Sequence, residues 1–130
     1  NHIEPKITEP TIVHHYPAPM AALSKLSDSD PGYAERFEVY VNDMELANAF
    51  TELTDADEQL RRLEIEREVR WKSGKPIFDI DTDFVEAVGR MPPSAGIALG
   101  VDRLVQALTG CQNIDDVLVL PMSKLFGNHE

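Results

Sequence analysis

Cysteine is almost absent from this sequence of 130 residues, since Cys111 is the only one. No internal disulfide can form, and there is no cysteine spacing that would bind a metal. No apolar run approaches the roughly 20 residues that a membrane-spanning helix needs. No secretory apolar segment opens the chain. These absences predict a cytoplasmic protein without a membrane partner.

Basic residues are also scarce: 12 lysines and arginines stand against 23 aspartates and glutamates, which gives a net charge of −11. Such a surface repels phosphate backbones at long range, so generic nucleic-acid binding by this stretch is unfavourable. Local contacts between single basic residues and a nucleic acid are not excluded by the net charge. With 42% hydrophobic and 27% charged residues, the composition is that of an ordinary globular domain with a core.

The periodicity of the chain predicts an α+β fold, in which an antiparallel sheet of four to six strands carries helices on one face. Residues 1–10 form a lead-in, residues 11–121 the folded domain, and residues 122–130 a tail. The expected strands cover residues 11–16, 36–41, 44–53, 94–101 and 117–120, and the expected helices begin near residues 54, 81 and 102.

Residues 94–104 are the most informative stretch. The large apolar residues Ile97, Leu99 and Val101 alternate with the nearly bare positions 96, 98 and 100, and a strand points alternate side chains to opposite faces. One face should therefore enter a core. The face formed by positions 96, 98 and 100 has two possible explanations. It could form one wall of a ligand-binding site, or it could be a close packing contact, since interior glycine often marks backbone crowding.

A helix is expected directly after this strand. Asp102 has the chemistry of an N-cap and Arg103 falls in the first turn. Leu104, Val105 and Leu108 would form its buried stripe. The positive charge of Arg103 would thus lie at the end of a strand that has almost no side chains on one face.

The hairpin predicted around Asn42 and Asp43 places two carboxylates on one face. A two-residue turn at 42–43 sets Glu38 opposite Ala47 and makes Glu45 its diagonal neighbour, roughly 7–8 Å away. Divalent cations that carry nucleotides use one or two carboxylates together with phosphate oxygens. The alternative is a solvated outer face of the sheet, where glutamates are common.

Two further features have ordinary structural explanations. The helix after residue 54 should have a structural role and a solvated charged face. Ion pairs four residues apart, such as Glu58–Arg62 and Glu68–Lys72, should stabilise it. Its apolar residues, with Trp71 at the end, should be buried. His14 and His15 are adjacent in a strand, so they should face opposite ways and cannot chelate one metal together.

Three blocks of the sequence resemble the second half of a class II aminoacyl-tRNA synthetase catalytic domain of the lysyl type. Residues 35–38 lead into residues 45–55, residues 92–96 lead into residues 100–104, and residues 117–121 close the domain. The second block resembles the third signature motif of the family. Together the blocks cover most of the chain, and their order makes the resemblance specific.

The resemblance implies a role for each site residue. Arg103, as the catalytic cation, would hold the ATP phosphates, Gly100 would let the nucleotide approach the backbone, and Glu45 with Leu46 would complete the ATP site. Glu38 and Glu45 would bind Mg²⁺. The amino-acid pocket would be lined by Asn48, Phe50, Gly96 and Ala98, and Glu52 would take the side-chain ammonium of the substrate.

The roles implied for Glu45 and Glu52 do not fit a regular strand. Glu45 and Glu52 are seven residues apart, so a regular strand places them on opposite faces. If both served one pocket, the strand would have to bulge, with residues 47–49 as the expected place. The family commonly has glycine where this chain has Ala49.

Ala98 separates two branches of the family. Lysyl-tRNA synthetases usually carry glycine there, whereas the similar elongation factor P ligases, which attach (R)-β-lysine to a lysine of that factor, carry alanine. A methyl group on the pocket floor would shift the backbone of the amino acid. The resemblance thus implies an ATP-dependent ligase for β-lysine acting on elongation factor P, or alternatively for lysine acting on tRNA(Lys).

The first and second signature motifs of the family have no counterpart in residues 1–130. We therefore expect this chain to be an incomplete part of a catalytic domain that does not form an adenylate alone, and the full-length protein to be a homodimer. A synthetase-like binding protein without catalysis is the rival from another class. The joint presence of Glu38, Glu45, Glu52 and Arg103 argues against it.

Overall fold

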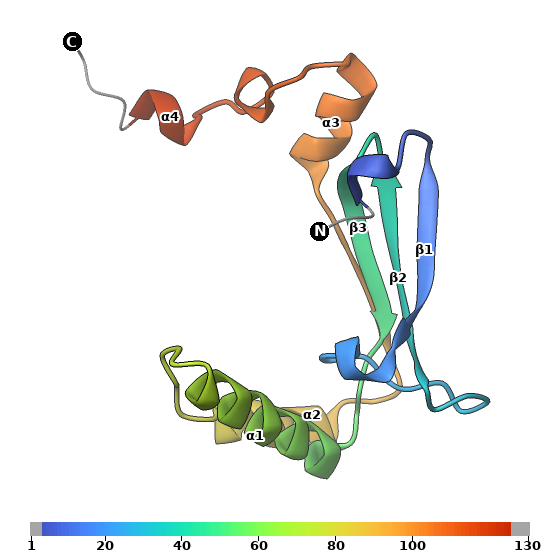
Figure 1. Cartoon of the computed structure of the whole chain (residues 1–130), viewed down its shortest axis with the longest axis vertical. Coiled ribbons are helices and arrows are strands. Elements are labelled where there is room, and N and C mark those ends of the chain that lie inside the picture. Colours follow the sequence, from blue (N-terminus) through green and yellow to red (C-terminus); the bar gives the residue numbers. More distant parts are fainter. Residues whose placement is uncertain (1–3, 126–130) are drawn as a thin grey trace. The chain divides into compact units, whose positions relative to one another are not determined.

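The computed structural model describes residues 4–125, and these form two compact units (Figure 1). The first unit comprises residues up to 13, residues 37–49 and residues from 97 onward. The second comprises residues 14–36 and 50–96. Each strand of the sheet contributes residues to both units, so the site residues are described unit by unit.

The sheet has four antiparallel strands in the order β1-β2-β3-β4, as the α+β interpretation predicts. They are β1 (Thr11–Pro17), β2 (Tyr33–Val41), β3 (Met44–Thr51) and β4 (Ala95–Leu99). Strands β2 and β3 form the predicted hairpin. Asn42 and Asp43 have φ of 49° and 61°, the left-handed conformation that a tight two-residue hairpin turn requires at both positions.

Strands β3 and β4 keep one register from end to end. Gly100 N–H donates to Leu46 O, and Glu52 N–H donates to Ser94 O, both at 2.9 Å. Six residues separate the two bonds on each strand, so neither strand carries a net inserted residue. This ladder therefore shows no net insertion at residues 47–49, where a bulge was considered.

Helices α1 (Ala56–Lys72) and α2 (Thr82–Arg90) pack against each other in the second unit. Asp55 and Asp81 are their N-caps, and each carboxylate accepts the backbone N–H three residues on. Trp71 is 67% exposed because α1 extends past its partner, so its predicted burial is wrong.

Helix α3 (Val101–Thr109) begins two residues earlier than expected. Gly100 is its N-cap and Asp102 lies inside the first turn, where its charge still suits the helix dipole. The predicted buried stripe is wrong, since Leu108 is 78% and Val105 41% exposed. Ile97, Leu99 and Val101 are exposed as well, because β4 is an edge strand and no element of residues 4–125 covers these side chains.

The C-terminal segment has less regular structure than predicted. A 3-10 turn covers Ile114–Asp116. Residues 117–120 are not a strand, because no strand of the described residues pairs with them, and Val119 is 94% exposed. The expected tail starts with a short helix, α4 (Met122–Leu125), and its remainder lies outside the described residues. In the lead-in, Glu4–Lys6 form a 3-10 turn, and residues 1–3 lie outside the description.

The buried apolar residues are small for the most part. They are Ala21, Ala34, Tyr40, Leu46, Ala47, Ala49, Leu53 and Val88. None of the helices within residues 4–125 combines the length and the apolar character needed to cross a membrane.

Candidate functional site

In the first unit, the start of α3 is held against β3 by two hydrogen bonds. Gly100 N–H donates to Leu46 O at 2.9 Å, and Arg103 Nη1 donates to Glu45 O at 2.7 Å. The four residues predicted to bind ATP therefore lie together. Arg103 contacts the backbone of Glu45, so the carboxylate of Glu45 is not committed to this guanidinium.

Gly100 is adapted to the side chain of Arg103. A Cβ at position 100 would lie 3.2 Å from Arg103 Cδ, closer than such atoms usually approach. The bare position lets the arginine fold back over the start of the helix. Arg103 is exposed and has no acidic partner among residues 4–125. Its charge is thus available to an anionic ligand.

The carboxylates predicted to bind Mg²⁺ lie on β2 and β3. Glu38 is 6% exposed, and Tyr40 donates its hydroxyl to Glu38 Oε2 at 2.5 Å. This bond orients one oxygen of the carboxylate. Two glutamates offer hard oxygen donors that suit Mg²⁺ completed by phosphate oxygens. The residues described contain no group of three or more candidate metal ligands.

Asn48 and Ala98 face each other across the β3–β4 ladder. The register set by the Leu46–Gly100 pair places Asn48 directly opposite Ala98, and opposite residues in a ladder have Cβ atoms roughly 4.5–5.5 Å apart. Two residues predicted to contact the amino acid are therefore neighbours on one face.

In the second unit, Glu52 reaches over a bare position of β4. An added Cβ on Gly96 would lie 2.9 Å from Glu52 Oε1, a distance that real Cβ atoms essentially never show. The same register places Phe50 opposite Gly96. Thus Phe50 and Gly96, predicted to line the amino-acid pocket, lie together with Glu52, predicted to bind the side-chain ammonium.

The predicted Glu58–Arg62 pair is present at 2.8 Å and belongs to a larger charged cluster at the start of α1. Glu58 accepts hydrogen bonds from Arg61 at 2.7 and 2.8 Å and from Arg62 Nε at 2.8 Å. These bonds lower the pKa of Glu58 to about 2. Arg62 also donates to the carbonyls of Ala22 and Ser24. The Glu58–Arg62 spacing was visible in the sequence, but the assignment of the whole charged face to solvent is wrong for this pair.

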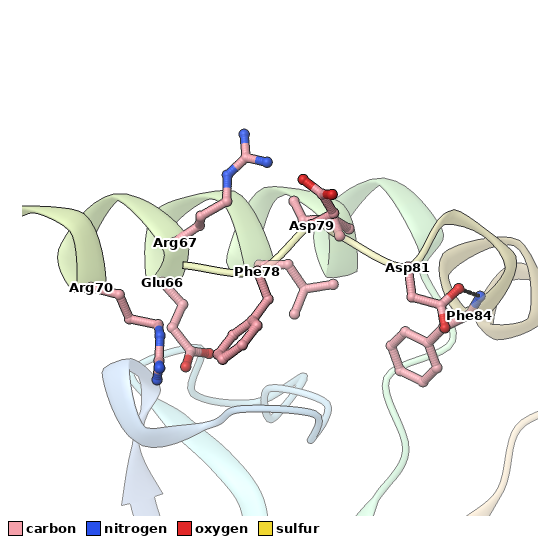
Figure 2. A pocket seen from close by; sticks show the side chains of 9 residues that line it. Glu66, Arg67, Arg70, Phe78, Asp79, Asp81 and Phe84 are labelled. Atoms are coloured by element: carbon pink, nitrogen blue, oxygen red, sulfur yellow. Dashed lines mark hydrogen bonds between the residues drawn. The ribbon is translucent and has the colours of Figure 1, made fainter. Parts of the chain in front are cut away.

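Two pockets lie in the second unit, and none of the predicted site residues lines them. The larger, of about 810 Å³, lies between residues 18–26 and α1, with Met20, Leu23 and Val69 in its wall. Figure 2 shows the smaller, of about 270 Å³, between α1 and the segment with Phe78 and Phe84. There Arg70 stacks over Phe78 at 5.5 Å.

The two adjacent histidines of β1 contact each other, against the prediction. His14 Nδ1 and His15 Nδ1 are hydrogen-bonded, and His15 also meets the ring of Tyr33 edge-on at 6.0 Å. His15 has φ of 59°, and this left-handed residue breaks the alternation on which the prediction depended.

Comparison with known proteins identifies close relatives. A family model described as tRNA synthetases class II (D, K and N) matches residues 2–124. The lysine–tRNA ligase of Mycoplasmoides gallisepticum is 45% identical over 119 residues, which cover 91% of this chain and 24% of that protein. The elongation factor P–(R)-β-lysine ligase of Yersinia enterocolitica is 44% identical over 125 residues, 94% of this chain and 38% of that protein. The chain therefore spans well under half of the length of these relatives.

Proposed function

The chain belongs to the class II tRNA synthetase family (D, K and N), and we propose that its protein is a ligase that activates a lysine-type amino acid with ATP. The carboxylate of Glu52 above the bare position 96 carries this proposal, in a chain whose relatives are named ligases for lysine or β-lysine. A carboxylate in a partly enclosed site is the natural partner of a side-chain ammonium.

The reaction would be the formation of an aminoacyl-adenylate. A carboxylate oxygen of the amino acid attacks the α-phosphorus of ATP, and pyrophosphate leaves with the electron pair of the broken P–O bond. Arg103 would stabilise the charge that spreads over the phosphates, supported by the hydrogen bond from its Nη1 to Glu45 O. Gly100 and Leu46 fix the helix start that presents this cation.

Glu38 and Glu45 would hold Mg²⁺, which supplies positive charge to the phosphates when it is bound. The hydroxyl of Tyr40 donates to Glu38 Oε2 and so orients this carboxylate. Asn48 and Phe50 would line the pocket for the amino acid.

We propose (R)-β-lysine as the substrate and a lysine of elongation factor P as the acceptor, because Ala98 places a methyl group opposite Asn48. The alternative is lysine with tRNA(Lys), favoured by the 45% identical lysine–tRNA ligase. A binding protein without catalysis is the third candidate. Both acceptors belong to translation, so we place the activity in the cytoplasm, with the full-length protein as a homodimer.

Pyrophosphate exchange into ATP tests the proposal on the full-length protein. We expect exchange that depends on (R)-β-lysine or α-lysine, and we expect Glu52→Gln to weaken it by removing the preference for the side-chain amine. Exchange with α-lysine far above (R)-β-lysine would move the protein to the tRNA branch, and Ala98→Gly should shift the ratio in that direction. If neither amino acid supports exchange while ATP still binds, the proposal is wrong and the protein is a synthetase-like binding protein without catalysis.

A further inference from the structure

Glu52 lies where three backbone segments of the second unit meet. Its N–H donates to Ser94 O on the β4 side, and an antiparallel bridge joins it to Ser24 on the other side. Next to this bridge, Leu53 N–H donates to Leu23 O at 2.9 Å, and Lys25 N–H donates to Thr51 O at 2.8 Å. The position of Glu52 thus depends on residues 23–25 as much as on β4.

Residues 21–24 form a strained turn. Ala22 has φ of 51°, a conformation that costs an ordinary residue roughly 1–2 kcal/mol. Ser24 is fully buried, and its N–H and Oγ both donate to Ala21 O at 2.8 Å. A turn of this kind keeps its shape only when the surrounding structure holds it.

Arg62 is the side chain that holds this turn. Its Nη1 donates to Ser24 O at 2.8 Å and to Ala22 O at 3.0 Å, so a single guanidinium nitrogen joins the two carbonyls that flank residue 23. The side chain of Arg62 is only 16% exposed. Water can therefore replace these bonds only in part, and their loss would be costly.

Glu58 orients Arg62 from the opposite side. It accepts a 2.8 Å bond from Arg62 Nε, while its own backbone N–H is tied to Asp55 Oδ1, the N-cap of α1. Arg61 shares the Glu58 carboxylate, but its side chain is 60% exposed and makes no hydrogen bond to the turn. The two neighbouring arginines share the Glu58 carboxylate, but only Arg62 is largely buried and contacts residues 22 and 24.

We propose that Arg62 is a positioning residue for Glu52, and hence for recognition of the ammonium of a lysine-type substrate; this rests on the proposed function. Arg62 joins the first turns of α1 to the carbonyls of Ala22 and Ser24, and the Ser24–Glu52 bridge passes this constraint to β3. Gly96 leaves the carboxylate the room to take up its place.

Arg62→Lys is the decisive variant and Arg61→Lys its matched control. Lysine keeps the charge but lacks the planar fork that binds a carboxylate and two carbonyls together. On the full-length protein, exchange is measured with the amino acid that it activates and with the analogue lacking the side-chain amine, norleucine for α-lysine or 3-aminohexanoate for β-lysine. We expect Arg62→Lys to reduce the preference for the amine about tenfold, through a higher KM for the amino acid and an unchanged KM for ATP.

The control should leave the preference for the amine unchanged. A loss in Arg62→Lys alone supports the proposal; equal preferences in the two variants, or a fall in melting temperature without a change in preference, overturns it. If Arg62→Lys does not fold, Glu58→Gln takes its place under the same criteria, since it releases Nε of Arg62.

The Glu52→Gln variant separates the two proposals. If it loses the preference for the amine while Arg62→Lys and Arg61→Lys behave alike, only the role of Arg62 is overturned. If Glu52→Gln keeps the preference, the assignment of Glu52, and with it the proposed substrate class, is overturned whatever Arg62 does.

Discussion

At the scale of single residues, the site is built from side chains that fit into positions without side chains. Glu52 reaches over Gly96, and Arg103 folds over Gly100. From the sequence, positions 96, 98 and 100 were interpreted as a surface without side chains against which a ligand could bind. The structure shows that part of this free space is taken by the protein's own charged side chains.

Gly96→Ala tests this fit. The added Cβ would lie 2.9 Å from Glu52 Oε1, so the carboxylate must move. We expect the KM for the amino acid in pyrophosphate exchange to rise about tenfold, with the KM for ATP and the melting temperature nearly unchanged. Gly32→Ala is a matched control, because it crowds another carboxylate oxygen, that of Asp30, at 3.1 Å in a loop without predicted site residues. Equal effects of the two substitutions would contradict the prediction.

Contacts between residues were predictable from the sequence where a local motif brings the residues together, and not where they depend on distant backbone. The motif around Arg103 identified the residues that meet at the start of α3. The bond from Arg62 to Ser24 O joins residues 38 positions apart, so no local pattern reveals it. The contact between His14 and His15 depends on one left-handed residue, which an alternating pattern cannot express.

At the scale of elements, the starts of α1 and α2 and the hairpin turn were the most predictable features. Asp55, Asp81 and the Asn42–Asp43 turn follow from the chemistry of caps and hairpins. Burial was not predictable, because alternation shows that one face of β4 is apolar but does not show that another element covers it. Ile97 is 63% exposed for this reason.

Asp55→Ala should destabilise the protein by about 1 kcal/mol through the loss of the N-cap of α1. Asp57→Ala is the control, since Asp57 is also acidic and in the first turn but is not the cap. We expect urea unfolding to show a lower midpoint for Asp55→Ala at an unchanged slope. A midpoint equal to that of Asp57→Ala would mean that charge near the helix start, not the cap, is what matters.

The stability of the α1 start should depend on pH through Glu58. Its pKa is about 2 in the folded protein, lowered by hydrogen bonds from Arg61 and Arg62, against about 4.3 in an unfolded chain. A lowered pKa stabilises the folded state above the unfolded value, and this contribution is lost as pH falls from about 4.3 towards 2.

We therefore expect Glu58→Gln to cost about 1 kcal/mol near neutral pH, and the difference from the parent protein to vanish near pH 2. Unfolding by urea at several pH values measures this. Glu68→Gln serves as the surface comparison, because Glu68 and Lys72 are exposed and their pair should contribute much less. A pH-independent difference at Glu58 would refute the assigned cause.

At the scale of the whole chain, the excess of 23 acids over 12 bases should oppose folding through self-repulsion. We expect the melting temperature to rise when sodium chloride increases from about 10 to 150 mM, because the Debye length falls to roughly 8 Å. A control series in sucrose, which stabilises without screening charge, separates the two effects. A melting temperature that falls with salt would show that the ion pairs outweigh the repulsion.

The register of β3 against β4 has a consequence for how such a protein can change its substrate. Two nearly bare positions of β4 lie across from larger residues of β3, Ala98 from Asn48 and Gly96 from Phe50, and Gly100, directly after β4, lies across from Leu46. A Cβ added at Gly96 would lie 2.9 Å from Glu52 Oε1, and one added at Gly100 would lie 3.2 Å from Arg103 Cδ. A larger side chain at either position would therefore displace a charged residue of the protein before it met any ligand. We expect enlargements at positions 96 and 100 to require a compensating change at the displaced residue, and single enlargements there to be poor intermediates.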